Sequence, residues 1–126
     1  MSVILVIDDE RKIRQMVSGI LVNAGYDVLE ARDGAEGLQF CRTTVVDVVI
    51  TDIVMPGKEG IETIRELRRE YPDIRIVAMS GGGGRDNNAY LEFAQRLGAD
   101  EIIAKPFRAG DLTAILERLI AKAPQS

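Results

Sequence analysis

Four apolar runs of the chain each end in side chains that can do chemistry: Asp8-Asp9, Asp52, Ser80 and Lys105-Pro106. If the runs are parallel strands of one sheet, these groups meet at one edge of that sheet. Three carboxylates that converge at a few ångströms repel one another strongly unless they hold a cation or share protons. The sequence therefore predicts a charged site built from residues far apart in the chain.

Three carboxylates around one point are suited to binding a hard, oxygen-seeking cation. A site with few protein ligands and several waters is typical of Mg2+, so we expect Mg2+ at Asp8, Asp9 and Asp52, with Mn2+ as the alternative. Lys105 adds an ammonium that points toward the acidic cluster, and an ammonium opposite a metal-carboxylate site is suited to holding a phosphoryl oxygen. Ser80 adds a hydroxyl at the same edge.

Each of these residues also has a purely structural interpretation when it is taken alone. Asp9 could cap the helix that follows the first strand. Lys105-Pro106 could be an ordinary loop, and Ser80 could be a turn or helix-cap residue. The addition of Asp52 to the Asp8-Asp9 pair favours the functional interpretation, because three converging carboxylates need a counter-charge.

The spacing of apolar residues predicts five strands that alternate with five helices. The predicted strands are Val3–Ile7, Asp27–Ala31, Val45–Thr51, Ile74–Met79 and Glu101–Ala104. Helical spacing of apolar residues appears at 13–24, 33–41, 61–67, 90–97 and 112–120, with Gly25 and Gly98 as C-terminal stops. Strict alternation predicts an α/β fold with helices on both faces of a parallel sheet, in the flavodoxin-like strand order 2-1-3-4-5.

Composition limits the remaining classes of protein. With 126 residues, 46% of them hydrophobic, we expect residues 1–126 to form a single domain with no output domain. The net charge of -4, with no basic stripe, argues against direct nucleic-acid binding. No apolar run approaches the roughly 18 residues that span a bilayer, so we expect no membrane insertion and a cytoplasmic location. Cys41 is the only cysteine, and the chain contains no histidine, which excludes histidine-based catalysis by its own residues.

In their order and context, these motifs resemble the response regulator receiver domain of bacterial two-component signalling. The matching segments are Ile7-Asp8-Asp9-Glu10, Asp52-Ile53-Val54-Met55-Pro56-Gly57, Met79-Ser80 and Lys105-Pro106-Phe107. The resemblance covers essentially the whole chain, and the four segments together are highly specific. It implies a phosphorylation-activated switch of the stand-alone, single-domain type.

The resemblance assigns a role to each matching residue. Asp52 resembles the phosphoacceptor, and Asp8 and Asp9 resemble the acidic pair that binds Mg2+. Val54 occupies the position whose backbone carbonyl completes the metal shell. Ser80 and Lys105 match the switch hydroxyl and the lysine that contacts the phosphoryl group.

The resemblance also implies partners. The phosphoryl donor would be a sensor histidine kinase or a histidine phosphotransfer protein, and the downstream target is unknown. Phosphoacceptance and autodephosphorylation would be self-catalysed steps of a signalling switch, so we do not expect an independent enzyme.

Two features depart from the family pattern. Ile102 stands where family members usually carry Tyr or Phe, three positions before the lysine. Four consecutive glycines, 81–84, follow Ser80; the run lacks the P-loop and dinucleotide-binding patterns, so nucleotide binding is not favoured. Because four glycines let a segment change conformation at little steric cost, we predict that remodelling of this loop replaces the aromatic switch.

Three other functions share part of this pattern. A phosphatase or mutase that forms an aspartyl phosphate would need a second Asp where Val54 stands. A flavin carrier shares the fold, but Asp8-Asp9 would repel a phosphate after the first strand. An interaction module that keeps the site but signals by docking alone stays open.

Overall fold

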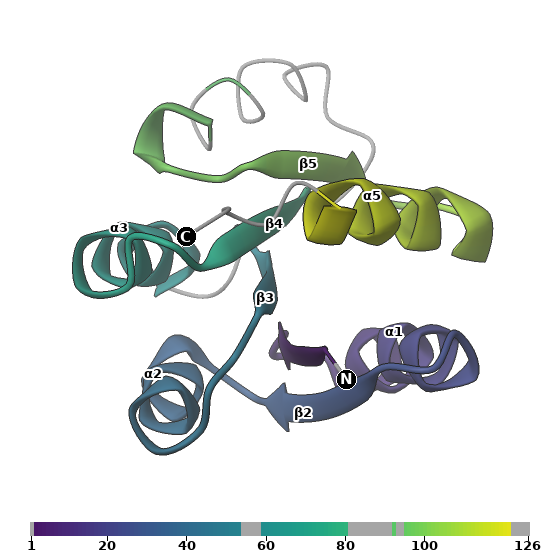
Figure 1. The fold of residues 1–126 in the computed structure, drawn as a ribbon, viewed down its shortest axis with the longest axis horizontal. Helices are drawn as coiled ribbons and strands as arrows, with labels where there is room; N and C mark the ends of the chain where they lie inside the picture. The colour runs from purple at the N-terminus through teal and green to yellow at the C-terminus, as the bar shows by residue number, and fades with distance from the viewer. Residues whose placement is uncertain (1, 54–58, 81–91, 93–94, 122–126) are drawn as a thin grey trace.

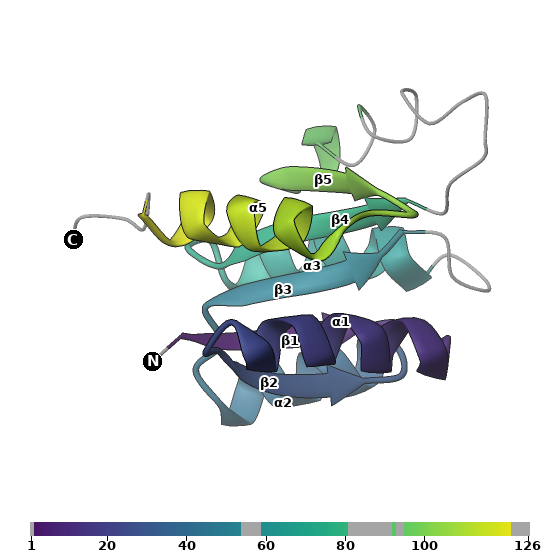
Figure 2. The ribbon, with the colours of Figure 1, turned by 90° about the vertical axis from the view of Figure 1, so that its right-hand side faces the viewer.

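The computed structural model describes residues 2–53, 59–80, 92 and 95–121. Its centre is a parallel sheet in the order β2-β1-β3-β4-β5, which confirms the predicted topology. The strands are β1 (Val3–Ile7), β2 (Asp27–Ala31), β3 (Val48–Asp52), β4 (Arg75–Ser80) and β5 (Glu101–Ala104). Figure 2 shows the strands running in the same direction, so their carboxyl ends share one edge of the sheet.

Helices cover both faces of the sheet. They are α1 (Arg11–Asn23), α2 (Gly34–Thr43), α3 (Glu59–Glu70) and α5 (Ala109–Ala121). In Figure 1, α1 and α5 lie on one face, and α2 and α3 lie on the other. Of the predicted fourth helix, Glu92 and residues 95–97 are helical, whereas Tyr90, Phe93 and Ala94 lie outside the described residues. Within the described ranges, no helix has the length and apolarity needed to cross a bilayer.

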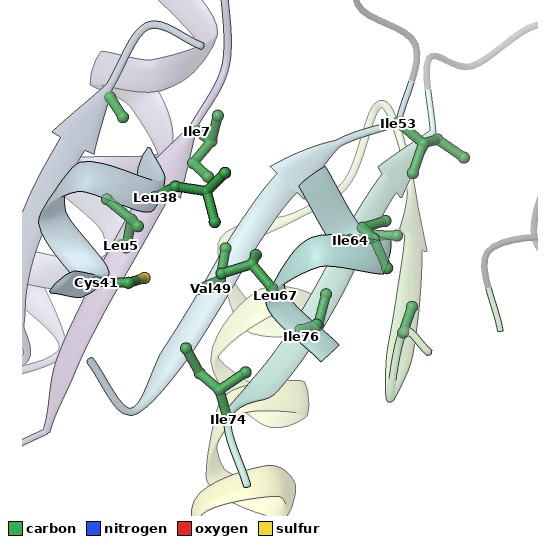
Figure 3. Close-up of a cluster of buried hydrophobic side chains, with 13 residues drawn as sticks. Leu5, Ile7, Leu38, Cys41, Val49, Ile53, Ile64, Leu67, Ile74 and Ile76 are labelled. Atoms are coloured by element: carbon green, nitrogen blue, oxygen red, sulfur yellow. The ribbon is translucent and has the colours of Figure 1, made fainter. Parts of the chain in front are cut away.

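Alternate residues of the central strands fill two separate cores. Leu5 and Ile7 of β1 point into the core beneath α2 and α3, which Figure 3 shows with Ile64 and Leu67 of α3. Ile4 and Val6 belong to the second core, beneath α1 and α5. These four side chains are fully buried. This two-sided burial explains why the strand is a continuous apolar run rather than an alternating one.

Two strands differ from the prediction at both ends: the third is Val48–Asp52 rather than Val45–Thr51, and the fourth is Arg75–Ser80 rather than Ile74–Met79. The third strand begins at Val48, three residues later than predicted, and Val45 is 83% exposed. The side chain of Asp47 accepts a hydrogen bond from the Val3 N–H at 2.7 Å, so a polar contact precedes the strand despite the apolar residues before it. At the other ends, β3 includes Asp52 and β4 includes Ser80. Both site residues are therefore fixed by strand pairing.

Helix ends follow the predicted local chemistry. Asp33 caps α2 by accepting a hydrogen bond from the Glu36 N–H at 2.9 Å. The Glu36 carboxylate in turn accepts from the Arg32 N–H at 2.8 Å, one residue before the expected capping-box position. Gly25 and Gly98 have φ of +96° and +123°, the left-handed region in which glycine is strongly favoured.

Candidate functional site

Three carboxylates converge at the carboxyl edge of the sheet. Asp8 and Asp9 directly follow β1, and Asp52 is the last residue of β3. Because β1 and β3 are neighbours with Ile7 opposite Thr51, the next residues along each strand lie side by side. One oxygen from each of Asp8, Asp9 and Asp52 lies within 4.8 Å of the others. Asp8 and Asp52 are buried, whereas Asp9 is exposed.

Lys105 reaches the same point from the end of β5. Its Nζ lies 2.8 Å from Oδ2 of Asp52 and 3.4 Å from Oδ2 of Asp8. Its backbone N–H donates to the Ser80 carbonyl at 2.8 Å, and the Lys105–Pro106 peptide bond is cis. The lysine is thus held by its main chain at β4 while its ammonium lies between two carboxylates.

Burial and charge set the protonation of these groups. Burial raises the pKa of Asp8, and this effect outweighs the opposing contributions of the Glu10 N–H, which donates to Oδ1 at 2.8 Å, and of the Lys105 charge. For Lys105, burial lowers the pKa, but the hydrogen bond to Asp52 and the charges of Asp52 and Asp8 together raise it above its usual value. The ammonium is therefore firmly protonated at neutral pH.

The charges of the cluster fit a divalent cation. When all groups are ionised, three carboxylates against one ammonium leave two uncompensated negative charges in a largely buried position. Carboxylate oxygens are the donors that Mg2+ prefers, and the exposed Asp9 leaves the cluster open to water on one side. The donor set therefore fits Mg2+, with Asp8, Asp9 and Asp52 as the residues that could hold it.

The remaining predicted residues are placed as follows. Ser80 lies at the same edge, 1% exposed, and is joined to Lys105 through the main chain. Val54 and the glycines at 81–84 lie outside the described residues. Ile102, on β5, packs against the core beneath α2 and α3. Its aliphatic side chain is partly buried there.

The capping interpretation of Asp9 is not supported by the geometry of α1. Glu10 occupies the N-cap position of this helix, and its side chain makes no capping hydrogen bond. The exposed Asp9 carboxylate instead belongs to the acidic cluster. This favours a role in the cluster over a role in the helix.

Gly60 is a site-supporting residue that the sequence analysis missed. It lies in the first turn of α3, and a Cβ built at this position would clash with the Asp52 carbonyl and lie 2.8 Å from the Cα of Ile53. Only a residue without a side chain lets α3 approach the Asp52 main chain this closely. In the sequence, Gly60 directly precedes the predicted helical segment 61–67, and a glycine at that boundary was the only signal available.

Arg14 is the second residue that was missed. Its Nη1 donates to the Asp8 carbonyl at 2.8 Å, and its Nε pairs with Oε1 of Glu30 at 3.2 Å. On α1 it shares a helical stripe with the buried Val17 and Leu21. An arginine on an otherwise core-facing stripe was the signal that could have identified it.

Comparison with known proteins agrees with this geometry. A family profile described as response regulator receiver domain matches residues 4–117. The aerobic respiration control protein ArcA of Escherichia coli K12 is 37% identical over 119 residues, which cover 94% of this chain and 48% of that protein. The phosphate regulon transcriptional regulatory protein PhoB of Pseudomonas aeruginosa is 34% identical over 94% of this chain and 52% of its own length. The chain thus spans about half the length of these curated relatives.

A solved structure of similar length has the same fold. The response regulator receiver domain protein from Clostridium thermocellum superposes with a TM-score of 0.87 at 35% identity, over 97% of this chain and 96% of that one. The profile match, the sequence identity and the fold point to one family. The chain belongs to the response regulator receiver domain family of two-component signalling systems.

Proposed function

We propose that Asp52 accepts a phosphoryl group from a phosphohistidine on a partner protein, and that the resulting acyl phosphate switches the chain between two signalling states. The observation that carries this proposal is the position of Lys105, whose ammonium bridges Asp52 and Asp8 beside a third carboxylate. This arrangement supplies a nucleophile, a fixed positive charge and oxygen donors for a cation at one point. Family membership supports the same chemistry.

In the transfer step, a carboxylate oxygen of Asp52 attacks phosphorus as the bond to the partner's imidazole nitrogen breaks. The imidazole leaves with the bonding electron pair, and protonation of its other ring nitrogen before the bond breaks lets it leave as neutral imidazole rather than as an anion. Negative charge on the phosphoryl oxygens is stabilised by the ammonium of Lys105. Burial of Asp52 and Lys105 strengthens this electrostatic contribution.

Mg2+ would be held by Asp8, Asp9 and Asp52, with the Val54 carbonyl as the further ligand that the family suggests. When bound, it would neutralise phosphoryl charge during the transfer. The chain's own contribution is to keep Asp8 and Asp52 close together despite their mutual repulsion. Lys105 performs this task through its contacts to both carboxylates.

A phosphohistidine donor must lie outside residues 1–126. The chain contains no histidine, so a phosphohistidine has to come from outside it. A sensor histidine kinase or a histidine phosphotransfer protein is the partner that this chemistry implies. The response would pass to a downstream target protein, through the surface that changes on phosphorylation.

The signal would end by hydrolysis of the acyl phosphate, because water can attack the same phosphorus and restore the Asp52 carboxylate. Val54 stands where an aspartyl-phosphate phosphatase or mutase would carry its second acid, so we propose no independent enzymatic activity. Phosphoacceptance and dephosphorylation are then two halves of one switching cycle.

The switch itself is proposed to run through Ser80 and the segment that follows it. A phosphoryl oxygen would attract the Ser80 hydroxyl at the same edge. Because Ile102 is a partly buried aliphatic side chain packed against the core rather than an aromatic one, the response is expected in the segment after β4. Amide hydrogen exchange with and without a phosphoryl mimic tests this: changed protection over residues 80–98 is expected, and unchanged protection there with changes elsewhere would contradict it.

Intact-mass spectrometry tests the proposed function as a whole. The protein is incubated with a small-molecule phosphodonor, with and without Mg2+, beside the Asp52→Asn variant. We expect one phosphoryl adduct that requires both Mg2+ and Asp52. A folded protein that binds Mg2+ but gains no adduct would favour signalling by docking alone.

A further inference from the structure

The main chain at Asp8 lies just beyond the regular pairing of β1. Its N–H donates to the Ala31 carbonyl at 3.1 Å, which extends the contact between β1 and β2 by one residue. Its carbonyl accepts a hydrogen bond from Nη1 of Arg14 at 2.8 Å, which is a side-chain contact. A buried carbonyl needs such a partner, and Asp8 is fully buried.

The peptide that Arg14 holds joins the first two acidic residues of the site. The Asp8 carbonyl and the Asp9 N–H belong to one planar unit, so fixing the carbonyl fixes the orientation of the whole unit. The Asp8 side chain leaves the backbone immediately before this unit, and the Asp9 side chain immediately after it. One hydrogen bond therefore constrains the directions of two carboxylates.

Arg14 is itself held in place. Its backbone N–H donates to the Glu10 carbonyl at 3.0 Å, in the first turn of α1. Its Nε donates to Oε1 of Glu30 on β2, and the arginine side chain is only 13% exposed. Two different nitrogens of one planar guanidinium are thus used at once, an arrangement that a lysine ammonium cannot reproduce.

We infer that Arg14 is a positioning residue for the divalent-cation site: through the Asp8 carbonyl it sets the peptide that carries the Asp8 and Asp9 carboxylates. The inference rests on the proposed function, because the cation is the Mg2+ proposed above. Glu30 orients Arg14. The carboxylates are thereby prepared before the cation arrives, which reduces the ordering that binding requires.

Electrostatics alone predicts the opposite behaviour, which makes the inference testable by the sign of an effect. Arg14 is a cation close to the acidic cluster, so its charge opposes the approach of Mg2+. Removing only that charge would tighten Mg2+ binding. Removing the support of the Asp8–Asp9 peptide would weaken it, by about tenfold if it resembles other residues that orient metal ligands.

The experiment is a Mg2+ titration of the full chain followed by amide NMR, which reports both the dissociation constant and the integrity of the fold. Wild type is compared with Arg14→Gln, Arg14→Lys and the control Arg118→Gln. The control removes the same charge and an Arg–Glu pair of 3.0 Å between α5 and β5. Urea unfolding of each variant records stability separately from Mg2+ affinity.

We expect Arg14→Gln to bind Mg2+ about tenfold more weakly than wild type, and Arg14→Lys to lie between the two. Arg118→Gln should match wild type. Unchanged or tighter binding by Arg14→Gln would overturn the inference, as would a loss of stability with no change in affinity. If Arg14→Gln does not fold, Arg14→Lys decides: affinity equal to wild type overturns the inference.

The same titration separates this inference from the proposed function. Wild-type protein that binds no Mg2+ would contradict the proposed function, and this inference with it. Wild-type binding combined with equal binding by both Arg14 variants would overturn the role of Arg14 alone.

Discussion

Nζ of Lys105 lies 2.8 Å from Oδ2 of Asp52, although 53 positions separate the two residues in the chain. Neither side chain is more than 14% exposed. The same ammonium also contacts Asp8 at 3.4 Å, so one cation holds together two buried carboxylates that would otherwise repel each other. The stability of this edge of the sheet and its chemistry therefore depend on the same lysine.

Replacement of Lys105 by Met should destabilise the protein in EDTA. Asp8 and Asp52 would be left buried without their counter-charge, at a cost of about 3 kcal/mol in the free energy of unfolding. Mg2+ should recover part of this loss, because it supplies a replacement positive charge. Urea unfolding followed by circular dichroism measures both effects. Lys12→Met, which removes an exposed charge of α1, is the control; equal losses in the two variants would contradict the account.

Much of the fold was predictable because apolar periodicity is a local property of the sequence. The bounds of β1, β2 and β5 match the structure, and the strand order follows from the alternation of strands and helices. The predicted start of the third strand was wrong because Val45 is apolar yet exposed. Local pattern cannot distinguish an exposed valine from a buried one.

The site was predictable in its residue types and not in its supporting contacts. Asp8, Asp52 and Lys105 stand at strand ends, and parallel pairing brings strand ends together. The hydrogen bond from Arg14 to the Asp8 carbonyl depends on the direction of a long side chain. The close approach of Gly60 to the Asp52 main chain depends on how α3 packs. The sequence holds a weak signal for each residue, but it does not show which main-chain group the residue contacts.

Asp8→Asn should stabilise the metal-free protein at neutral pH. The pKa of Asp8 is raised in the folded state, so its stabilising contribution is complete below the unfolded-state pKa and is lost as the pH rises through the folded-state pKa. Asn cannot ionise and escapes this loss. The stability of Asp8→Asn relative to wild type in EDTA should therefore grow from about pH 4 to pH 7.

Thermal unfolding over this pH series makes the comparison, with Asp73→Asn as an exposed control. Added Mg2+ should stabilise wild type more than Asp8→Asn, because the variant lacks one ligand. A stability difference that does not vary with pH would show that ionisation of Asp8 is not its source.

Gly60→Ala and Gly19→Ala should have opposite effects on stability. Both glycines lie in helices, where alanine is favoured by about 1 kcal/mol. A Cβ at Gly19 meets nothing within 4 Å, so this variant should be more stable than wild type. A Cβ at Gly60 would collide with the main chain at Asp52 and Ile53, and overpacking of this kind costs about 1–3 kcal/mol. Urea unfolding of the pair checks the prediction, and stabilisation by both substitutions would refute it.

Arg68→Gln should lower the free energy of unfolding more than the matched substitution Arg118→Gln. The guanidinium donates to the Gly98 carbonyl at 2.7 Å, to the Pro72 carbonyl at 2.8 Å and to Oδ2 of Asp100 at 2.7 Å. It thereby ties α3 to the chain just before β5, and its loss should cost about 3 kcal/mol. Arg118→Gln breaks a more exposed pair and should cost about 0.5 kcal/mol or less. Equal unfolding midpoints in guanidinium chloride would contradict this difference.

The most direct test of the central claim is to locate the phosphoryl group. Borohydride reduces an aspartyl phosphate to homoserine, so the protein is treated with a phosphodonor and Mg2+, reduced, digested and analysed by peptide mass spectrometry. We predict homoserine at position 52, dependent on donor and Mg2+. Phosphorylated protein without homoserine at that position, or with homoserine at Asp8 or Asp9 instead, would contradict the assignment of Asp52 as the phosphoacceptor.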